Sequence, residues 1–284
     1  MHNRGSDSDM FKNFSTKNIS LYSWFSFIPF VVAVPVIVFL FAVGIIPAVY
    51  LWATMIGWIL ISGLGIATGY HRIFCHKTHP DLPRWKENII LFCGALGGQG
   101  SSITWTAIHR GYHHRYADTE KDLHSPIHGF WHSFFGWTLA VTEKSQIIKL
   151  NSATDLLRKS NHIWFHNHQL KIQWLVPILL AIVNWQLALA LIVLPTGISI
   201  LQDNLVNYFA HRKSLIGYRY GETKDQSYNN LILGLLGWGQ GWHHGHHLKP
   251  NSFNPGSAVS GYWWEIDTCV IFLPFIGKPR PEAQ

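Results

Sequence analysis

The sequence predicts an all-α integral membrane protein with four transmembrane helices in two hairpins and a cytoplasmic helical cap. Three observations support this fold class. Only 13% of the 284 residues are charged and 48% are hydrophobic, which is too little charge for a soluble protein of this size. Two apolar stretches, residues 24–70 and 172–206, each exceed the ~20 residues that one spanning helix needs. All 22 Lys and Arg residues lie outside these stretches.

Each apolar stretch contains a break that predicts a hairpin. The segment GIIP at residues 44–47 interrupts the first stretch, so residues 27–43 and 48–68 are expected to cross the membrane in opposite directions. In the second stretch, the polar residues Asn184 and Gln186 mark the expected reversal between residues 174–183 and 187–206. The first arm of this second hairpin is short.

The positive charges predict the orientation. Three Lys and Arg residues precede residue 21, twelve lie between residues 72 and 171, and seven follow residue 211. Two hairpins place these segments on one side of the membrane, and the positive-inside rule makes that side the cytoplasm. We therefore expect a single domain, residues 1–284, with a flexible polar N-terminus (1–20), a cap (71–171 and 207–284) and both termini in the cytoplasm. The net charge of +7 favours contact with anionic lipid headgroups. The sequence contains no basic recognition helix that would indicate binding to nucleic acid.

The 18 histidines are the most informative residues of the chain. Half of them occur in three short clusters, HRIFCH at residues 71–76, HRGYHH at residues 109–114 and HHGHH at residues 243–247, and a further one ends the segment NYFAH at residues 207–211. All of these segments are expected to emerge at the cytoplasmic ends of the apolar helices. The three cysteines are scattered and form no CxxC pair, so neither a disulfide framework nor a zinc ribbon is indicated.

Helical spacing predicts which histidines converge. Residues three or four apart share one face of an α-helix, so His109 should lie with His113, and His243 with His246 and His247. Asn207 and His211 have the same spacing. By contrast, His71 and His76 are five residues apart and do not share a face of an α-helix. They should therefore bind different metal ions or lie on either side of a helix end.

The number and type of these side chains predict a dinuclear metal site. Neutral imidazole suits iron, zinc, copper or nickel, and nine histidines are too many for one ion. Two irons with nitrogen ligands at the mouth of a membrane helix bundle point to dioxygen chemistry on a hydrophobic substrate. A metal or haem carrier would instead pair histidines within the spanning helices across the bilayer. Arg72 and Arg110, inside the clusters, are interpreted as partners of nearby acids or lipid headgroups.

These motifs resemble those of membrane-bound fatty acyl desaturases of the stearoyl-CoA (delta-9) type. HRIFCH is similar to the first histidine box of that family, HRGYHH to the second and HHGHH, preceded by GQGW, to the third. NYFAH resembles the family's Asn-x-x-x-His element, and YADTEKDLHSP and WWEID extend the resemblance over residues 69–267.

The resemblance implies a site and a reaction. An external electron donor, ferredoxin or cytochrome b5, would reduce two bound iron ions to Fe²⁺, and O₂ would be the co-substrate for inserting a cis double bond into a saturated acyl chain. No separate acid or base is implied. Gln99 and Trp105 would line the acyl tunnel, and Asp203 falls at a third tunnel position. The implied iron ligands are His71, His76, His109, His113, His114, His211, His243, His246 and His247, with Asn207 bound through water.

Three departures from the family pattern keep alternatives open. The second box is HxxxHH rather than HxxHH, and DLHSP replaces the common DPHSP. Ala107 and Ile108 replace an Arg-Asp pair found in animal acyl-CoA enzymes, which argues against recognition of a CoA headgroup and leaves the acyl carrier open among CoA, acyl carrier protein and a glycerolipid. A related di-iron hydroxylase or ketolase acting on an alkyl or carotenoid substrate is the alternative function, because sequence spacing does not distinguish these outcomes.

Overall fold

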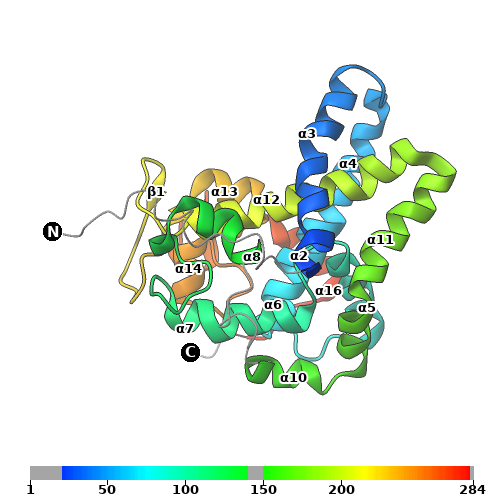
Figure 1. The fold of residues 1–284 in the computed structure, drawn as a ribbon. Coiled ribbons are helices and arrows are strands. Elements are labelled where there is room, and N and C mark those ends of the chain that lie inside the picture. Colours follow the sequence, from blue (N-terminus) through cyan, green and yellow to red (C-terminus); the bar gives the residue numbers. More distant parts are fainter. Residues whose placement is uncertain (1–20, 140–149, 282–284) are drawn as a thin grey trace.

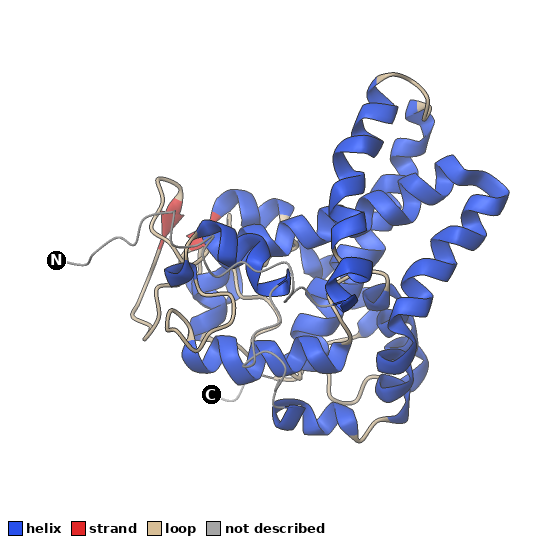
Figure 2. Cartoon of the chain, viewed as in Figure 1, coloured by secondary structure: helices blue, strands red, loops and turns tan. Residues whose placement is uncertain are grey.

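The computed structural model describes residues 21–139 and 150–281, and in these ranges the protein is predominantly helical (Figure 2). The only strands described are β1 (Gly217–Tyr218) and β2 (Asn229–Asn230), which form an antiparallel ribbon. Long helices project from a cap of shorter helices and loops (Figure 1). The described part is therefore a helical membrane-type fold, as the sequence predicts.

The first apolar stretch forms a helical hairpin. Its first arm is α2 (Leu21–Ser26) followed by α3 (Ile28–Ala42), and its second arm is η2 (Ala48–Tyr50), α4 (Leu51–Trp58) and the π-helix η3 (Ile59–Cys75). The predicted break is confirmed, because Gly44 adopts φ +77° between the two arms. The second arm does not end at residue 68 as expected, however, and its helical hydrogen bonds continue through the first histidine box.

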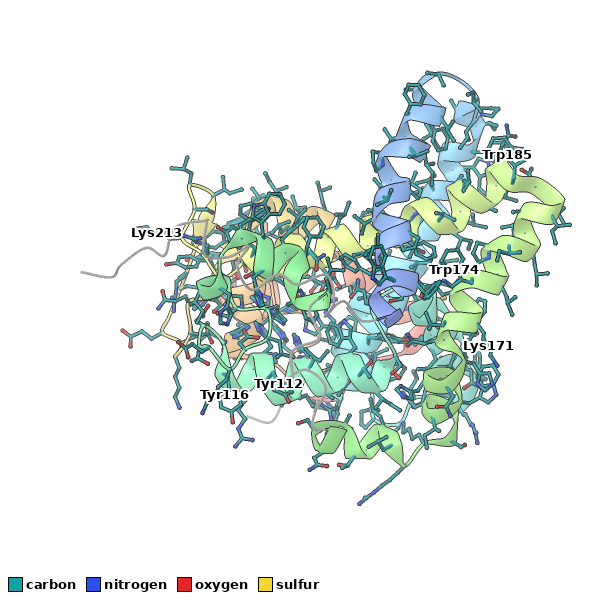
Figure 3. The ribbon with its side chains drawn as sticks, in the orientation of Figure 1. Tyr112, Tyr116, Lys171, Trp174, Trp185 and Lys213 are labelled. Atoms are coloured by element: carbon teal, nitrogen blue, oxygen red, sulfur yellow. The ribbon has the colours of Figure 1, made fainter. Side chains whose placement is uncertain are left out.

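The second apolar stretch also differs in its limits. It consists of α11 (Ser160–Ala188), η8 (Leu189–Val193) and α12 (Leu194–Phe209). The helix begins at Ser160 rather than near residue 174, so a segment expected in the cap is the lower part of α11. Asn184 has non-helical angles (φ −154°, ψ 99°), and the chain bends back there, beside Trp185 (Figure 3). The Nδ2 atom of Asn184 donates a hydrogen bond to the Tyr50 hydroxyl, which ties the bend to the first hairpin.

Three helices in the described ranges are long and apolar enough to cross a membrane. They are Trp24–Ala42, Ala48–Cys75 and the 50-residue span Ser160–Phe209. A helix rises 1.5 Å per residue, so 50 residues would extend ~75 Å, far more than the ~30 Å hydrocarbon core. The kink at Asn184 divides this span into two arms.

Short helices build the cap around the lower ends of the long ones. The helix α5 (Arg84–Ala95) packs on η3, where a Cβ added to Gly65 would lie 2.5 Å from the Gly94 nitrogen. The other cap elements are α6 (Ser102–Ile108), η4 (His109–His113), α7 (His114–Tyr116), η5 (Pro126–His128), η6 (His132–Gly136), α8 (Trp137–Leu139), η7 (Leu150–Ala153), α10 (Thr154–Leu157), α13 (Leu231–Leu236), α14 (His243–Leu248), α15 (Ser257–Ser260), η9 (Thr268–Phe272) and α16 (Leu273–Ile276).

The two arginines of the histidine boxes hold cap segments together. Arg72 forms a fully buried ion pair with Asp267 at 2.8 Å and donates hydrogen bonds to the Trp238 carbonyl. Arg110 pairs with Asp155 at 2.8 Å. The interpretation of both arginines as partners of acids is confirmed. The Arg72–Asp267 pair joins η3 to the start of η9, and the hydrogen bonds to Trp238 join η3 to the segment that leads into α14.

Candidate metal centre

The first histidine box lies at the end of a π-helix. The backbone N–H of His76 donates to the carbonyl of His71 at 3.1 Å, which is the i to i+5 hydrogen bond of a π-helix. This winding brings the two imidazoles to the same side, with ring centroids 5.0 Å apart. His76 is the C-cap residue of η3, so the pair does straddle a helix end, but the two side chains face one site rather than two.

The second box repeats this geometry. In η4 the backbone N–H of His114 donates to the His109 carbonyl, and their Nε2 atoms lie 3.0 Å apart. His109 and His113 are neighbours, as their spacing predicts, with ring centroids 5.3 Å apart. They belong to different groups of ligand atoms, however, because the π-helix replaces the 3.6-residue period with a wider turn. His113 faces a different group of histidines.

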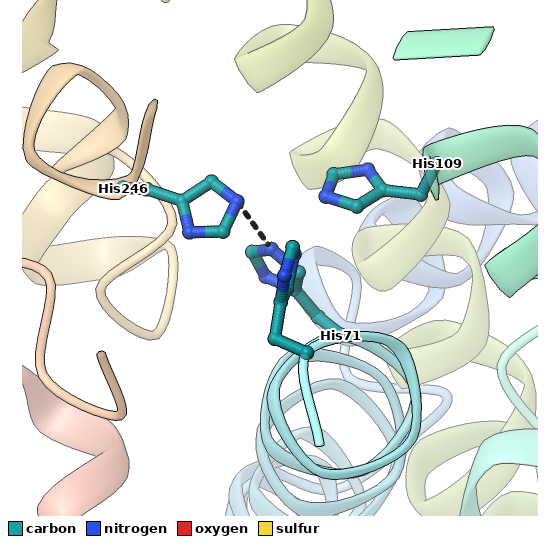
Figure 4. Close-up of side chains that lie close together, drawn as sticks. His71, His109 and His246 are labelled. Atoms are coloured by element: carbon teal, nitrogen blue, oxygen red, sulfur yellow. Dashed lines mark hydrogen bonds between the residues drawn. The ribbon is translucent and has the colours of Figure 1, made fainter. Parts of the chain in front are cut away.

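One group of imidazoles gathers His71, His76, His109 and His246, whose ligand atoms lie within 4.8 Å of one another. The Nε2 atoms of His71 and His246 are 3.0 Å apart, and the rings approach from separate elements (Figure 4). His114 joins them, because its Nε2 lies 2.9 Å from that of His246. This first group draws its residues from η3, η4, the start of α7 and α14.

A second group consists of His113, His211, His243 and His247. Their Nε2 atoms form a chain of contacts: 3.2 Å from His113 to His247, 3.1 Å from His247 to His243 and 2.8 Å from His243 to His211. The predicted pairing of His243 with His247 is confirmed. The predicted pairing with His246 is wrong, because α14 lies between the two groups and presents His246 to the first.

Three carboxylates that the sequence did not single out support the second group. Asp122 lies 3.0 Å from Nδ1 of His113, Asp118 lies 3.2 Å from Nδ1 of His211, and Asp225 lies 2.8 Å from Nδ1 of His247. Asp118 and Asp122 belong to the segment YADTEKDLHSP, and their closeness in sequence to the second box could have identified them as partners of its histidines. Asp225 lies in a loop outside the boxes, and no sequence signal pointed to its role.

These carboxylates determine what the second group can bind. A carboxylate acceptor at Nδ1 keeps the proton there and directs the Nε2 lone pair inward. Inward lone pairs about 3 Å apart repel one another unless a cation lies between them. Two nitrogens ~2.1 Å from a shared ion at right angles lie ~3.0 Å apart, which matches the spacings found. The donor set therefore fits a transition-metal ion.

Burial keeps these side chains in the state that a metal requires. Desolvation, followed by the repulsion of neighbouring imidazoles, lowers the pKa of His76, His109 and His246 well below the ordinary value. The imidazoles are therefore neutral ligands at pH 7. For Asp118, burial opposes ionisation, but the hydrogen bond with His211 leaves its pKa below the usual range, so this carboxyl remains a hydrogen-bond acceptor.

Both groups open onto one cavity of about 580 Å³, a volume typical of small-molecule sites. Trp105 donates from Nε1 to Oε1 of Gln99 at 3.2 Å, and Gln99 donates to the Ser199 carbonyl at 3.2 Å. Asp203, also in the wall, accepts a 2.6 Å hydrogen bond from Gln240. The wall residues relevant to the predicted site are His71, Gln99, Trp105, His109, His113, His124, Asp203, Asn207, Gln240 and His243.

Two further residues complete the placement of the predicted site. Asn207 lines the cavity beside the second group. His244 is not among the implied ligands, and it contacts Ser227 and the Tyr220 carbonyl. The structure thus gathers all nine histidines implied as ligands and leaves His244 outside.

Comparisons with known proteins all point to the same protein family. The family model described as "Fatty acid desaturase" matches residues 46–252. Delta-9 acyl-lipid desaturase 2 of Arabidopsis thaliana is 30% identical over 253 residues, which is 82% of this chain and 76% of the relative. The sn-1 stearoyl-lipid 9-desaturase of Synechocystis sp. is 29% identical over 77% of this chain and 66% of its own length. Icosanoyl-CoA 5-desaturase of Limnanthes douglasii is 31% identical over 72% of this chain and 56% of its own.

Proposed function

Because the chain belongs to the fatty acid desaturase family, we propose that it inserts a cis double bond at the delta-9 position of a saturated acyl chain. The observation that carries this proposal is the opening of both histidine groups onto one cavity whose wall includes Gln99 and Trp105. Family membership makes the protein a fatty acid desaturase and therefore an oxidoreductase. It does not favour the hydroxylase or ketolase alternative, whose products would carry added oxygen.

The proposed ligands divide between two irons. His71, His76, His109, His114 and His246 would hold one ion, and the remaining histidines of the nine would hold the other with Asn207 through water. When bound, the irons supply the activation of dioxygen for removing two hydrogens from adjacent methylenes. With two electrons and two protons from outside, the acyl chain becomes an alkene and O₂ becomes two waters.

The remaining residues would bind and orient the acyl chain. An alkyl C–H bond offers no polar group for recognition, so the position of the double bond depends on where the cavity wall places the chain. Trp105 stacks on His109 with centroids 4.7 Å apart, and its indole N–H is held by Gln99. This pair would place one carbon–carbon bond of the substrate beside the first histidine group.

The two arms of the Ser160–Phe209 span support a topology of four crossings. We propose that each arm crosses the membrane, with the turns near Gly44 and Asn184 on the far side. The cap and both termini would then lie in the cytoplasm, as the distribution of Lys and Arg favours. The cap would bind its electron donor, ferredoxin or cytochrome b5, through its positively charged surface.

The acyl carrier we propose is a membrane glycerolipid. Two of the relatives described above are named for acyl-lipid substrates and one for an acyl-CoA. Ala107 and Ile108 are buried and half-buried, respectively, and offer no charge to a CoA headgroup. A glycerolipid would reach the cavity without such a charge pair.

The decisive experiment is fatty acid methyl ester profiling of a host that expresses the chain. A new monounsaturated peak, absent with His113→Ala and present with His168→Ala, is the expected result, since the contacts of His168 in the described part of the chain are with the Trp164 carbonyl and ring. Separation of lipid classes before analysis identifies the carrier. A hydroxylated product would instead support the alternative function, and a profile identical to that of His113→Ala would contradict both.

A further inference from the structure

An exposed aliphatic patch lies next to the metal-binding cap. Leu215 is completely exposed, and Leu236 and Ile232 are 63% and 53% exposed. Exposed apolar side chains of this size are normally scattered on a soluble surface, and a contiguous group marks an interaction site. The group, which we call the α13 patch, consists of Leu215, Ile216, Leu231, Ile232, Leu235 and Leu236.

Strand pairing makes the α13 patch contiguous. The register of the ribbon pairs Gly217 with Asn230, so the residues directly outside this pair, Ile216 and Leu231, are neighbours at the end of the ribbon. Helix α13 begins at Leu231 and packs against α12. The two halves of the patch therefore form one surface, although 14 residues separate Ile216 from Leu231 in the chain.

The position of the α13 patch identifies what covers it. The span Ser160–Phe209 ends six residues before Leu215, so the patch continues the apolar surface of a membrane helix. Arg212 and Lys213 are exposed between the two. Cations in this position extend to lipid phosphates.

Charge and composition also favour lipid over a protein partner. The patch contains only Leu and Ile, which offer no hydrogen-bonding groups, and no Asp or Glu occurs between residues 204 and 221 or within α13. In Figure 1, α13 lies against α12 on the side of the cap from which α3 and α4 extend. Apolar area on that side is costly to expose to water and is not costly in the acyl region of a bilayer.

We propose that the α13 patch is inserted in the membrane interface and forms a second, in-plane contact between the cap and the bilayer. This contact is separate from the spanning helices. His211 lies between the end of α12 and Leu215, so the contact sets the depth of the second histidine group relative to the lipid surface. The proposal concerns the lipid bilayer alone and does not depend on the reaction that the cavity supports.

Cysteine labelling tests this contact. The three cysteines of the chain are all buried, so Leu215→Cys and Leu236→Cys each introduce one accessible thiol for a polarity-sensitive fluorophore. The labelled full chain is placed in lipid nanodiscs with or without nitroxide lipids. The matched control is Lys121→Cys, an exposed position near α7, which lies on the other side of the cap in Figure 1.

We expect blue-shifted emission and loss of intensity with nitroxide lipids at both patch positions, and neither effect at residue 121. Emission at residues 215 and 236 as water-like as at residue 121 would overturn the proposal. A blue shift that persists without lipid quenching and increases with the number of chains per disc would assign the patch to self-association and would also overturn it.

Discussion

The side chain of Asp203 accepts a 2.6 Å hydrogen bond from Nε2 of Gln240, which joins α12 to the loop in front of α14. Each of these segments leads into a member of the second histidine group: His211 follows the end of α12 and His243 is the first residue of α14, with their Nε2 atoms 2.8 Å apart. The Asp203–Gln240 contact therefore holds two ligand-bearing segments in register.

Replacement of Asp203 tests this contact. Asp203→Leu removes the acceptor, so we expect the purified protein to lose metal from the second group and to lose desaturation. Asp203→Asn keeps a carbonyl acceptor for Gln240 and should retain most of the metal. The measurement is metal content per chain by mass spectrometry, with circular dichroism to confirm folding, and equal metal content in wild type and Asp203→Leu would refute the assignment.

Asp225 is predicted to set the metal affinity of the second group. Asp225→Asn weakens the acceptor at Nδ1 of His247, and loss of such an outer partner typically lowers metal affinity ~10–100-fold. Competition with a chelator measures the change. Asp81→Asn, at an exposed position, removes one carboxylate elsewhere and should leave affinity unchanged; a similar loss in both variants would point to net charge instead.

Trp105 is predicted to control where the double bond forms. Trp105→Ala removes both the ring that stacks on His109 and the hydrogen bond to Gln99, so the acyl chain can shift along the cavity. A misplacement of ~1 Å can cost ~10²-fold in rate, and a spread of double-bond positions should accompany this loss. Trp164→Ala, at an exposed site on α11, is the control, and product analysis that found one unchanged position in Trp105→Ala would contradict the prediction.

The metal-free protein should become less stable as the pH falls from 7 to 5. Burial lowers the pKa of His109 and His246 well below 6.5, so below pH 6.5 the unfolded chain binds more protons than the folded one. The free energy of unfolding is therefore highest above pH 6.5, and it decreases as the pH falls toward the lowered pKa of the folded state. Thermal unfolding at several pH values measures the slope, which should be smaller in His246→Gln; an equal slope in that variant would assign the effect to other groups.

The buried Arg72–Asp267 pair is predicted to be essential for stability. Asp267→Ala leaves the guanidinium of Arg72 buried without its counter-charge, which typically costs ~3–5 kcal/mol. Denaturant unfolding in detergent measures this loss. Arg84→Ala removes an exposed arginine whose contact is with Ser160, and its effect should be below about 1 kcal/mol; comparable losses in the two variants would argue against the pair.

The sequence by itself determined the membrane class, the break at residues 44–47, the interruption at Asn184 and the residue types that form the two histidine groups. These depend on local properties, namely hydrophobicity, charge and residue type, that can be recognised along the chain. Only the tertiary structure decided how the histidines divide into two groups. The π-helical turns at His71 and His109 are not apparent from an assumed 3.6-residue period, and they move His76 and His114 into the first group.

The supporting acids likewise depended on tertiary structure. Asp225 reaches His247 only because the loop that carries it folds back against α14, and His71 meets His246 across 175 residues of chain. Such contacts are fixed by the packing of segments that lie far apart in the sequence. The sequence therefore specified the residue types of the candidate metal centre, whereas the packing of distant segments specified which of these side chains face one another.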